Sequence, residues 1–228
     1  MSTSVSENTL NFLLKLAKNN HKDWMDEHRK EYKASEKSLK ALYAEIEQGL
    51  AKTDEIAKVK IFRINRDIRF SKDKTPYNVH RSVSYSRAGA HRRGGYYLRI
   101  EPGNKSAIAG GFFSPEPADL LRIRKEFEMD SNVIRKILAA PTIKEVFGGN
   151  FVPRDPVKTA PKGFSKDDPN IDLIRLKSYF LTHSYSDAEV TATDFSDKVV
   201  THFELLRPYF DYMSEILTTD LNGVSLLE

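Results

Sequence analysis

The stretch that decides the fold class is residues 81–113, RSVSYSRAGAHRRGGYYLRIEPGNKSAIAGGFF. It contains successive runs of aromatic and β-branched residues separated by turn-forming residues, a pattern typical of consecutive strands. Pro102 and Gly103 suit the second and third positions of a type II turn, which predicts a hairpin. Similar runs stand before and after this stretch. The predicted strands are 59–70, 81–87, 95–101, 105–113 and 178–184.

Helices are predicted on both sides of the strands, because apolar residues recur there at the spacing of one helix face. Pro208 is expected to kink the last helix. These patterns predict an α+β protein with a mainly antiparallel sheet of about four to five strands, flanked by N-terminal and C-terminal helices. The predicted helices are 6–18, 23–52, 117–129, 131–139, 171–177 and one that begins at Ser186 or Asp194 and ends near Leu217.

The length of 228 residues and the lack of a convincing linker predict a single domain over residues 1–228. The chain contains no cysteine, which excludes disulfides, thiolate chemistry and cysteine-based metal sites. It has no apolar run of about 18 residues, and its first ten residues lack the features of a secretion signal. We therefore expect a cytoplasmic protein with no membrane partner.

Positive charge is concentrated in the middle of the chain. Residues 58–105 hold 13 Lys and Arg against 3 Asp and Glu, a balance of +10, whereas the whole chain balances at +4. A basic segment inside a nearly neutral protein indicates an anionic partner. The alternative is that residues 181–228, with 9 acidic and 2 basic side chains, pack over this segment and neutralise it.

The most informative part of the basic segment is residues 60–81, KIFRINRDIRFSKDKTPYNVHR. At a period of two residues, the apolar side chains between Phe62 and Phe70 would form the core face of a strand. Arg66 falls among them. Because a guanidinium cannot lose its charge, Arg66 needs a carboxylate, a group of carbonyls or a bound anion.

Guanidinium forks beside an ammonium and a phenol are suited to binding a phosphate or a carboxylate. His80 and Tyr77 are the candidate catalytic residues, as proton donor or acceptor. An internal network of Arg and Asp side chains is the alternative, because buried ion pairs give the same sequence pattern. The predicted ligand-binding residues are Arg63, Arg66, Asp67, Arg69, Asp73, Lys74, Tyr77 and Arg81.

Residues 63–77, RINRDIRFSKDKTPY, resemble the motif R-x-x-R-D-x-R-F-x-x-D-K-x-x-Y of an uncharacterised bacterial family, domain of unknown function 2461. The segments NNHKDWMDEHRKEY, GGFFSPEP and PKGFSKDDP are similar to the same family, so the resemblance covers nearly the whole chain. Met25 is a small departure, since an aromatic residue is expected there. The resemblance implies no known activity, but it supports the choice of the motif residues as the candidate site.

These observations predict a protein that binds a phosphate-bearing or other anionic small molecule in an Arg- and Lys-rich cleft, with enzymatic activity left open. One alternative is a nucleic-acid-binding module that uses a basic β-ribbon with Arg92 and Arg93 at its tip. Another is a structural or protein-interaction role. No metal site is predicted, because the six histidines do not stand at metal-ligand spacings.

Overall fold

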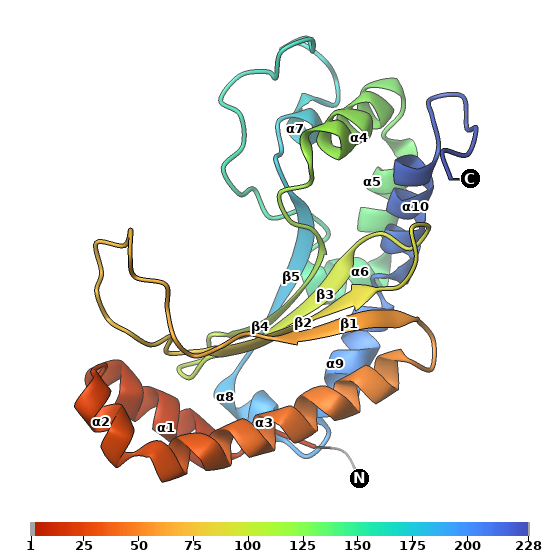
Figure 1. Cartoon of the computed structure of the whole chain (residues 1–228). Coiled ribbons are helices and arrows are strands. Elements are labelled where there is room, and N and C mark those ends of the chain that lie inside the picture. Colours follow the sequence, from red (N-terminus) through yellow and green to blue (C-terminus); the bar gives the residue numbers. More distant parts are fainter. Residues whose placement is uncertain (1–2, 228) are drawn as a thin grey trace. The chain divides into compact units, whose positions relative to one another are not determined.

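The computed structural model describes residues 3–227, and it confirms the predicted α+β class. Within these residues the strands form one antiparallel sheet in the order β1-β2-β3-β4-β5 (Figure 1). Strands that are neighbours in the sheet are therefore also consecutive strands in the sequence. The strands are β1 (Ile56–Ile61), β2 (Arg81–Arg87), β3 (Gly95–Ile100), β4 (Ser106–Phe112) and β5 (Tyr179–Tyr185).

Helices stand before the sheet, between β4 and β5, and after β5. The predicted boundaries of the helix at 117–129 are confirmed, and most of the others shift by only a few residues. The helices are α1 (Glu7–Lys18), α2 (Lys22–Glu27), α3 (Arg29–Leu50), α4 (Pro117–Met129), α5 (Asn132–Leu138), α6 (Pro141–Phe147), α7 (Ile171–Ile174), α8 (Asp187–Thr191), α9 (Phe195–Glu204) and α10 (Arg207–Thr218).

The chain divides into two compact units. Unit 1 comprises Met1–Tyr85, Tyr97–Ile108 and Ser184–Thr201, and unit 2 comprises the remaining segments. Strands β2 to β5 each contribute residues to both units. The single domain over residues 1–228 stays a prediction.

The first helix of unit 1 follows from its sequence. The Ser6 side chain accepts a hydrogen bond from the Thr9 backbone N–H, which satisfies one of the free donors at the start of α1. The apolar face of α1 then packs against α3 and α2 and against two residues of the motif segment. This cluster consists of Phe12, Leu13, Leu16, Trp24, Met25, Ile64 and Tyr77, with Tyr32 against it.

The prediction of one helix over residues 23–52 is wrong, because the chain breaks it at His28 into α2 and α3. His28 adopts a non-helical conformation with φ −99° and ψ 17°. Its ring stacks on Trp24 with 4.0 Å between the centroids, and its Nδ1 lies 2.9 Å from the Trp24 carbonyl oxygen. These contacts hold the break in place.

The prediction of a strand over residues 59–70 is also wrong beyond Ile61. The apolar residues that follow do not share one face: Ile64 is buried, whereas the Phe70 residue is 97% exposed. Arg66 therefore does not lie on the apolar face of a strand. The chain instead forms a long loop between β1 and β2, drawn in orange to gold in Figure 1. Backbone and side-chain hydrogen bonds within the loop replace those of a strand.

Unit 2 has a core rich in aromatic rings. Tyr179 of β5 meets Phe127 and Phe151 edge to face, each with 5.5 Å between centroids. The Tyr179 hydroxyl donates to the Leu173 carbonyl oxygen at 3.1 Å, and the Tyr209 hydroxyl donates to the Tyr179 carbonyl oxygen at 2.7 Å. These buried phenols therefore pack as aromatic residues while their polar ends remain bonded.

Residues 186–218 form three helices, so the prediction of one kinked terminal helix is wrong. A capping box between Ser186 and Glu189 starts α8. Pro208 lies in the first turn of α10, where its missing N–H costs no helical hydrogen bond. Proline thus begins a separate helix here and does not bend a continuous one.

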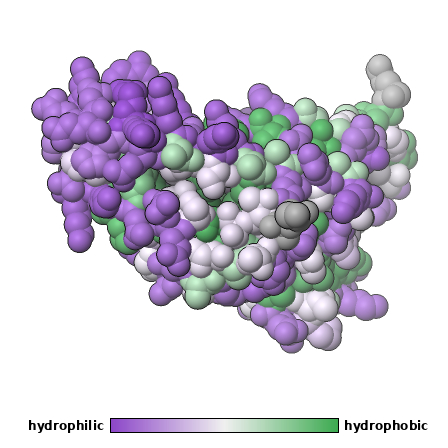
Figure 2. Space-filling view, turned by 90° about the horizontal axis from the view of Figure 1, so that it is seen from below, coloured by the Kyte–Doolittle hydropathy of each residue, from purple (hydrophilic) through white to green (hydrophobic). Residues whose placement is uncertain are grey.

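On the face seen from below, hydrophilic residues gather at one end, drawn on the left, and over the rest of the face hydrophilic and hydrophobic residues are mixed (Figure 2). Scattered exposed apolar side chains are normal for a folded protein. Among the described residues, no helix combines the length and the apolar character needed to cross a bilayer.

Gly111 of β4 provides a direct test of the packing between β4 and β5. Its φ is +145°, and a Cβ atom there would lie 2.3 Å from the Tyr179 carbonyl oxygen. We expect Gly111→Ala to lower the free energy of unfolding by at least about 3 kcal/mol, because the backbone of β5 would have to move. Urea denaturation at equilibrium measures this change.

The matched control is Gly103→Ala, in the predicted type II turn. Gly103 also has a positive φ, +81°, but a Cβ there would meet nothing within 4 Å. In this variant the free energy of unfolding should fall only by about 1–2 kcal/mol, the cost of a positive φ for a residue that has a Cβ atom. Equal losses in the two variants would contradict the proposed close contact between β4 and β5.

Candidate functional site

The motif loop between β1 and β2 is closed by Arg66. Its Nη1 donates to Asp73 Oδ2 at 2.6 Å, to the Thr75 carbonyl oxygen at 2.9 Å and to the Thr75 hydroxyl. The Arg66 backbone N–H donates to the Pro76 carbonyl oxygen at 2.8 Å, beside an antiparallel bridge between Asn65 and Tyr77. We call this set of bonds the Arg66 clamp. It brings the two ends of the motif together.

Two further motif pairs bond within the loop. Asp67 accepts from Arg69 Nε at 2.9 Å and from Arg69 Nη2 at 2.6 Å, the bidentate geometry that suits a guanidinium and a carboxylate. These bonds lower the pKa of the exposed Asp67 carboxyl. The Lys74 ammonium donates to the Ile68 carbonyl oxygen at 3.0 Å. Part of the motif therefore forms an internal network of Arg and Asp side chains, as in the alternative interpretation of the sequence.

Tyr77 anchors the loop to the helices of unit 1. Its residue is 8% exposed, and its ring belongs to the apolar cluster with α1 and α2. Its backbone is held by the Asn20 side chain, which donates to the Tyr77 carbonyl oxygen at 2.9 Å and accepts from its N–H at 3.1 Å. The loop is thus fixed at its base.

Beside the clamp lies an open cleft of about 410 Å³, which we call the motif cleft. Of the residues predicted for the site, it brings together Arg63, Arg66, Asp67, His80 and Arg81. All of its lining residues belong to unit 1. The residues that sequence reasoning missed are Phe62, Asn65, Asn78, Ser82 and Tyr97.

Other predicted residues do not line the motif cleft. Arg69, Asp73, Lys74 and Tyr77 hold the loop together or anchor it, as described above. Among the missed residues, Asn78 stands inside the quoted segment and its side-chain amide is a recognisable polar signal. Tyr97 of β3 had no such signal, because only the pairing of β3 with β2 brings it to the cleft.

The guanidinium groups of the cleft differ in their partners. Arg81 has a side chain only 4% exposed, and it forms an ion pair with Glu36 of α3. Arg66 uses Nη1 for the clamp, while its Nε and Nη2 have no acceptor within residues 3–227. The exposed Arg63 guanidinium has no ion-pair partner in that same part of the chain. With Asp67 the only carboxylate in its described lining, the cleft carries a surplus of positive charge.

His80 is half-buried in the motif cleft. Burial lowers the pKa of its imidazole below the ordinary value of 6.5, and the charges of Arg99 and Arg81 act in the same direction, while Glu101 opposes them. The neutral imidazole is therefore favoured at neutral pH. In this form one ring nitrogen can accept a proton.

The cleft also has an aromatic wall. Phe62 and Tyr97 meet edge to face with 6.1 Å between their centroids. The Lys60 ammonium lies 4.9 Å from the centroid of the Phe62 ring, within the range of a cation–π contact. The lining of the motif cleft thus includes both hydrogen-bond donors and aromatic rings.

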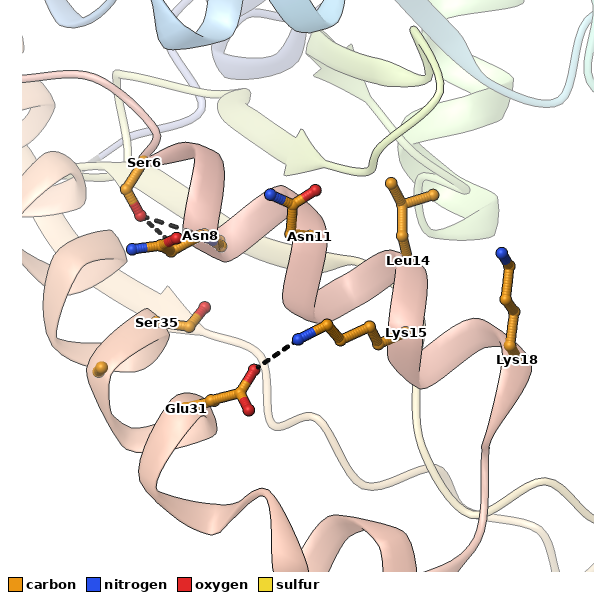
Figure 3. A pocket seen from close by; sticks show the side chains of 10 residues that line it. Ser6, Asn8, Asn11, Leu14, Lys15, Lys18, Glu31 and Ser35 are labelled. Carbon is orange, nitrogen blue, oxygen red and sulfur yellow. Dashed lines mark hydrogen bonds and ion pairs between the residues drawn. The ribbon is translucent and has the colours of Figure 1, made fainter.

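A second cavity in unit 1, of about 550 Å³, lies between α1 and α3 (Figure 3). The figure shows Lys15 extending from α1 to Glu31 of α3, with 3.3 Å between Nζ and Oε2. Lys15 and Glu31 neutralise each other, and the other lining groups are mainly neutral side chains of α1 and α3. Lys18 leaves this lining with a surplus of one positive charge, against two for the motif cleft, where three arginines stand beside Asp67.

At the tip of the predicted basic β-ribbon, Arg93 is engaged within unit 2. The Arg93 guanidinium forms an ion pair with Asp119, and its backbone N–H donates to the Ser214 hydroxyl at 2.8 Å. All three residues belong to unit 2. Within the described residues, no group of three or more His, Asp or Glu side chains lies together in a way that could hold a metal ion.

Comparison with known proteins identifies the family. The family model described as "Conserved hypothetical protein (DUF2461)" matches residues 8–212. The match covers most of the chain and includes the whole motif, so the chain belongs to this family. No curated protein and no solved structure matches.

The Arg66 clamp predicts how the Asp73 carboxyl titrates. Hydrogen bonds from the Thr75 backbone N–H, from the Thr75 hydroxyl and from Arg66 lower its pKa. Because the pKa is lower in the folded state, Asp73 stabilises the protein above the ordinary value of about 3.9, and this contribution is lost as the pH falls through the lowered pKa. A ¹³C NMR titration of the carboxyl measures the pKa.

Thr75→Val removes the hydroxyl donor and keeps the shape of the side chain. We expect the pKa of Asp73 to rise toward its ordinary value in this variant, because one hydrogen bond to the charged carboxylate is lost. A pKa of Asp73 at or above about 3.9 in the unmodified protein would contradict the clamp.

Proposed function

We propose that this member of the DUF2461 family binds a compact anionic small molecule, such as one bearing a phosphate group, in the motif cleft. The observation that carries the proposal is how the hydrogen-bond donors of the Arg66 guanidinium are used. Its Nη1 closes the loop, whereas Nε and Nη2 keep their N–H groups without an acceptor in residues 3–227, beside an open cleft. A guanidinium edge of this kind is suited to two oxygens of one phosphate or carboxylate.

The other groups of the cleft fit this ligand class. Arg63 supplies a second cation, which forms no ion pair within the described chain although its charge acts on Asp67. Asn65 and Asn78 add side-chain amides, which donate hydrogen bonds and carry no charge. Arg81 adds a fixed positive charge from the interior, although Glu36 compensates part of it. The combined positive charge of these groups favours an anion over a neutral or cationic ligand.

His80 is our candidate for the proton acceptor in any chemistry at this site. It lines the same cleft as the three arginines, and its lowered pKa keeps it neutral at the pH of most cells. Tyr77, the second catalytic candidate, is packed into the apolar cluster of the helices, so the proposal assigns it the anchoring of the loop.

Substitution of Arg63 tests anion binding with little risk to folding, because this side chain is exposed. We expect Arg63→Ala to weaken the binding of inorganic pyrophosphate about tenfold, through the loss of one charge-assisted contact. Isothermal titration calorimetry at constant ionic strength measures the affinity.

The control for Arg63→Ala is Lys58→Ala. Lys58 is an exposed cation on β1 that does not line the cleft, so its removal changes the net charge equally. Pyrophosphate affinity should stay within about twofold of the unmodified protein. An equal loss in both variants would indicate nonspecific charge attraction and would contradict a defined site, as would the absence of any pyrophosphate binding.

Because His80 lines the cleft and its pKa is lowered, we expect pyrophosphate binding to depend on pH. A bound anion favours the charged imidazolium and should raise the lowered pKa of His80. By linkage, pyrophosphate should bind more tightly as the pH falls through the range in which His80 gains its proton. NMR titration of the His80 ring with and without pyrophosphate measures the pKa of His80 in the bound and in the free protein. A His80→Gln variant should lose this part of the pH dependence; an unchanged pH profile would exclude His80 from the site.

A further inference from the structure

One residue of the motif loop is not explained by the clamp or by the cleft. Phe70 is 97% exposed, whereas the other large exposed apolar residues range from 37% to 63%. It lies outside the lining of the motif cleft. A phenylalanine that gains nothing from the core yet presents its whole ring to solvent is suited to a partner that covers it.

The loop holds Phe70 in a defined position. On one side of it, Asp67 binds the Arg69 guanidinium through two hydrogen bonds. On the other side, Lys74 donates to the Ile68 carbonyl oxygen, and Asp73 takes part in the Arg66 clamp. Hydrogen bonds therefore hold the backbone on both sides of Phe70. Because this segment is already ordered, binding a partner costs it little further conformational freedom.

Basic residues flank Phe70 along the chain. The Arg69 guanidinium carbon lies 6.0 Å from the Phe70 centroid, and the Arg69 side chain is 77% exposed. Lys72 and Lys74 are exposed as well. Asp67 is paired with Arg69 and Asp73 with Arg66, so the positive charge of this segment that no ion pair within residues 3–227 offsets is that of Lys72 and Lys74. An approaching partner thus meets an aromatic face together with cations.

We propose that residues 69–74 form a contact surface for single-stranded nucleic acid, in which a base stacks on Phe70 and the adjacent backbone phosphates contact Arg69 and Lys72. Every base has a flat face, so a single aromatic ring beside cations binds a strand without reading its sequence. The proposal goes beyond the motif cleft and does not depend on it, because neither Phe70 nor Lys72 lines that cleft.

A membrane surface fits this loop less well. Membrane binding grows with the apolar area that enters the lipid, and Phe70 is the only large apolar side chain that the loop exposes. Its neighbours Arg69 and Ser71 are polar. A nucleic-acid strand requires only one ring for each stacked base.

The test is fluorescence anisotropy of the full chain with a labelled twelve-nucleotide oligo-dT at low salt. We expect Phe70→Ala to weaken binding at least about fivefold and Phe70→Trp to retain it, since indole also stacks on a base. Leu121→Ala, which removes another exposed apolar side chain, should leave the affinity unchanged. Circular dichroism should show that all three variants are folded.

Further measurements separate the possible outcomes. A duplex of the same length should bind more weakly than the single strand, because its bases are already stacked. Lys72→Ala should reduce the dependence of log K on log salt by about 0.7, the value for one phosphate contact on a single strand. The proposal is overturned if oligo-dT does not bind at low salt, if Phe70→Ala binds as well as the unmodified protein, or if Phe70 is required only for binding phosphatidylserine vesicles. Arg63→Ala should still bind oligo-dT, so this proposal and the proposed anion site can fail separately.

Discussion

The interaction on which the site depends is the set of bonds made by one guanidinium nitrogen. Arg66 Nη1 contacts Asp73 and Thr75, seven and nine residues further along the chain, and so closes the motif into a loop. The closed loop places Arg63 and Asp67 on the side of the motif cleft and carries Phe70 outward. A charged hydrogen bond of this kind is short and directional, which suits it to fixing a loop that has no regular secondary structure.

The motif therefore has two kinds of residue. Asp73, Lys74 and Tyr77 hold or anchor the loop, whereas Arg63 and His80 face the cleft and form few bonds of their own. Arg66 belongs to both groups, and this double role reconciles the two interpretations of the sequence pattern. An internal ion-pair network and an anion-binding edge are compatible, because a guanidinium has five N–H donors and the clamp uses only those of one nitrogen.

The sequence predicted the elements whose signals are local. The antiparallel strands after residue 81, the capped helix that follows Ser6 and the helix at 117–129 follow from alternation, capping and apolar spacing. It failed where a side chain overrides the local pattern: His28 splits a helix, and the Arg66 clamp turns an alternating segment into a loop. Of the residues that line the motif cleft, the three arginines, Asp67 and His80 were predicted as candidates from the sequence. It did not identify Tyr97 or Glu36, which reach the site from β3 and α3 through tertiary packing alone.

Arg66 closes the loop with one nitrogen, and we propose that it offers the rest of its guanidinium to an anion. The most direct measurement is a crystal structure of the protein grown with pyrophosphate. The account predicts phosphate oxygens within about 2.7–3.2 Å of Arg66 Nε or Nη2, with the bonds from Nη1 to Asp73 and Thr75 intact. A structure with pyrophosphate bound elsewhere and only water in the motif cleft, or with Arg66 released from Asp73 to reach the anion, would contradict it.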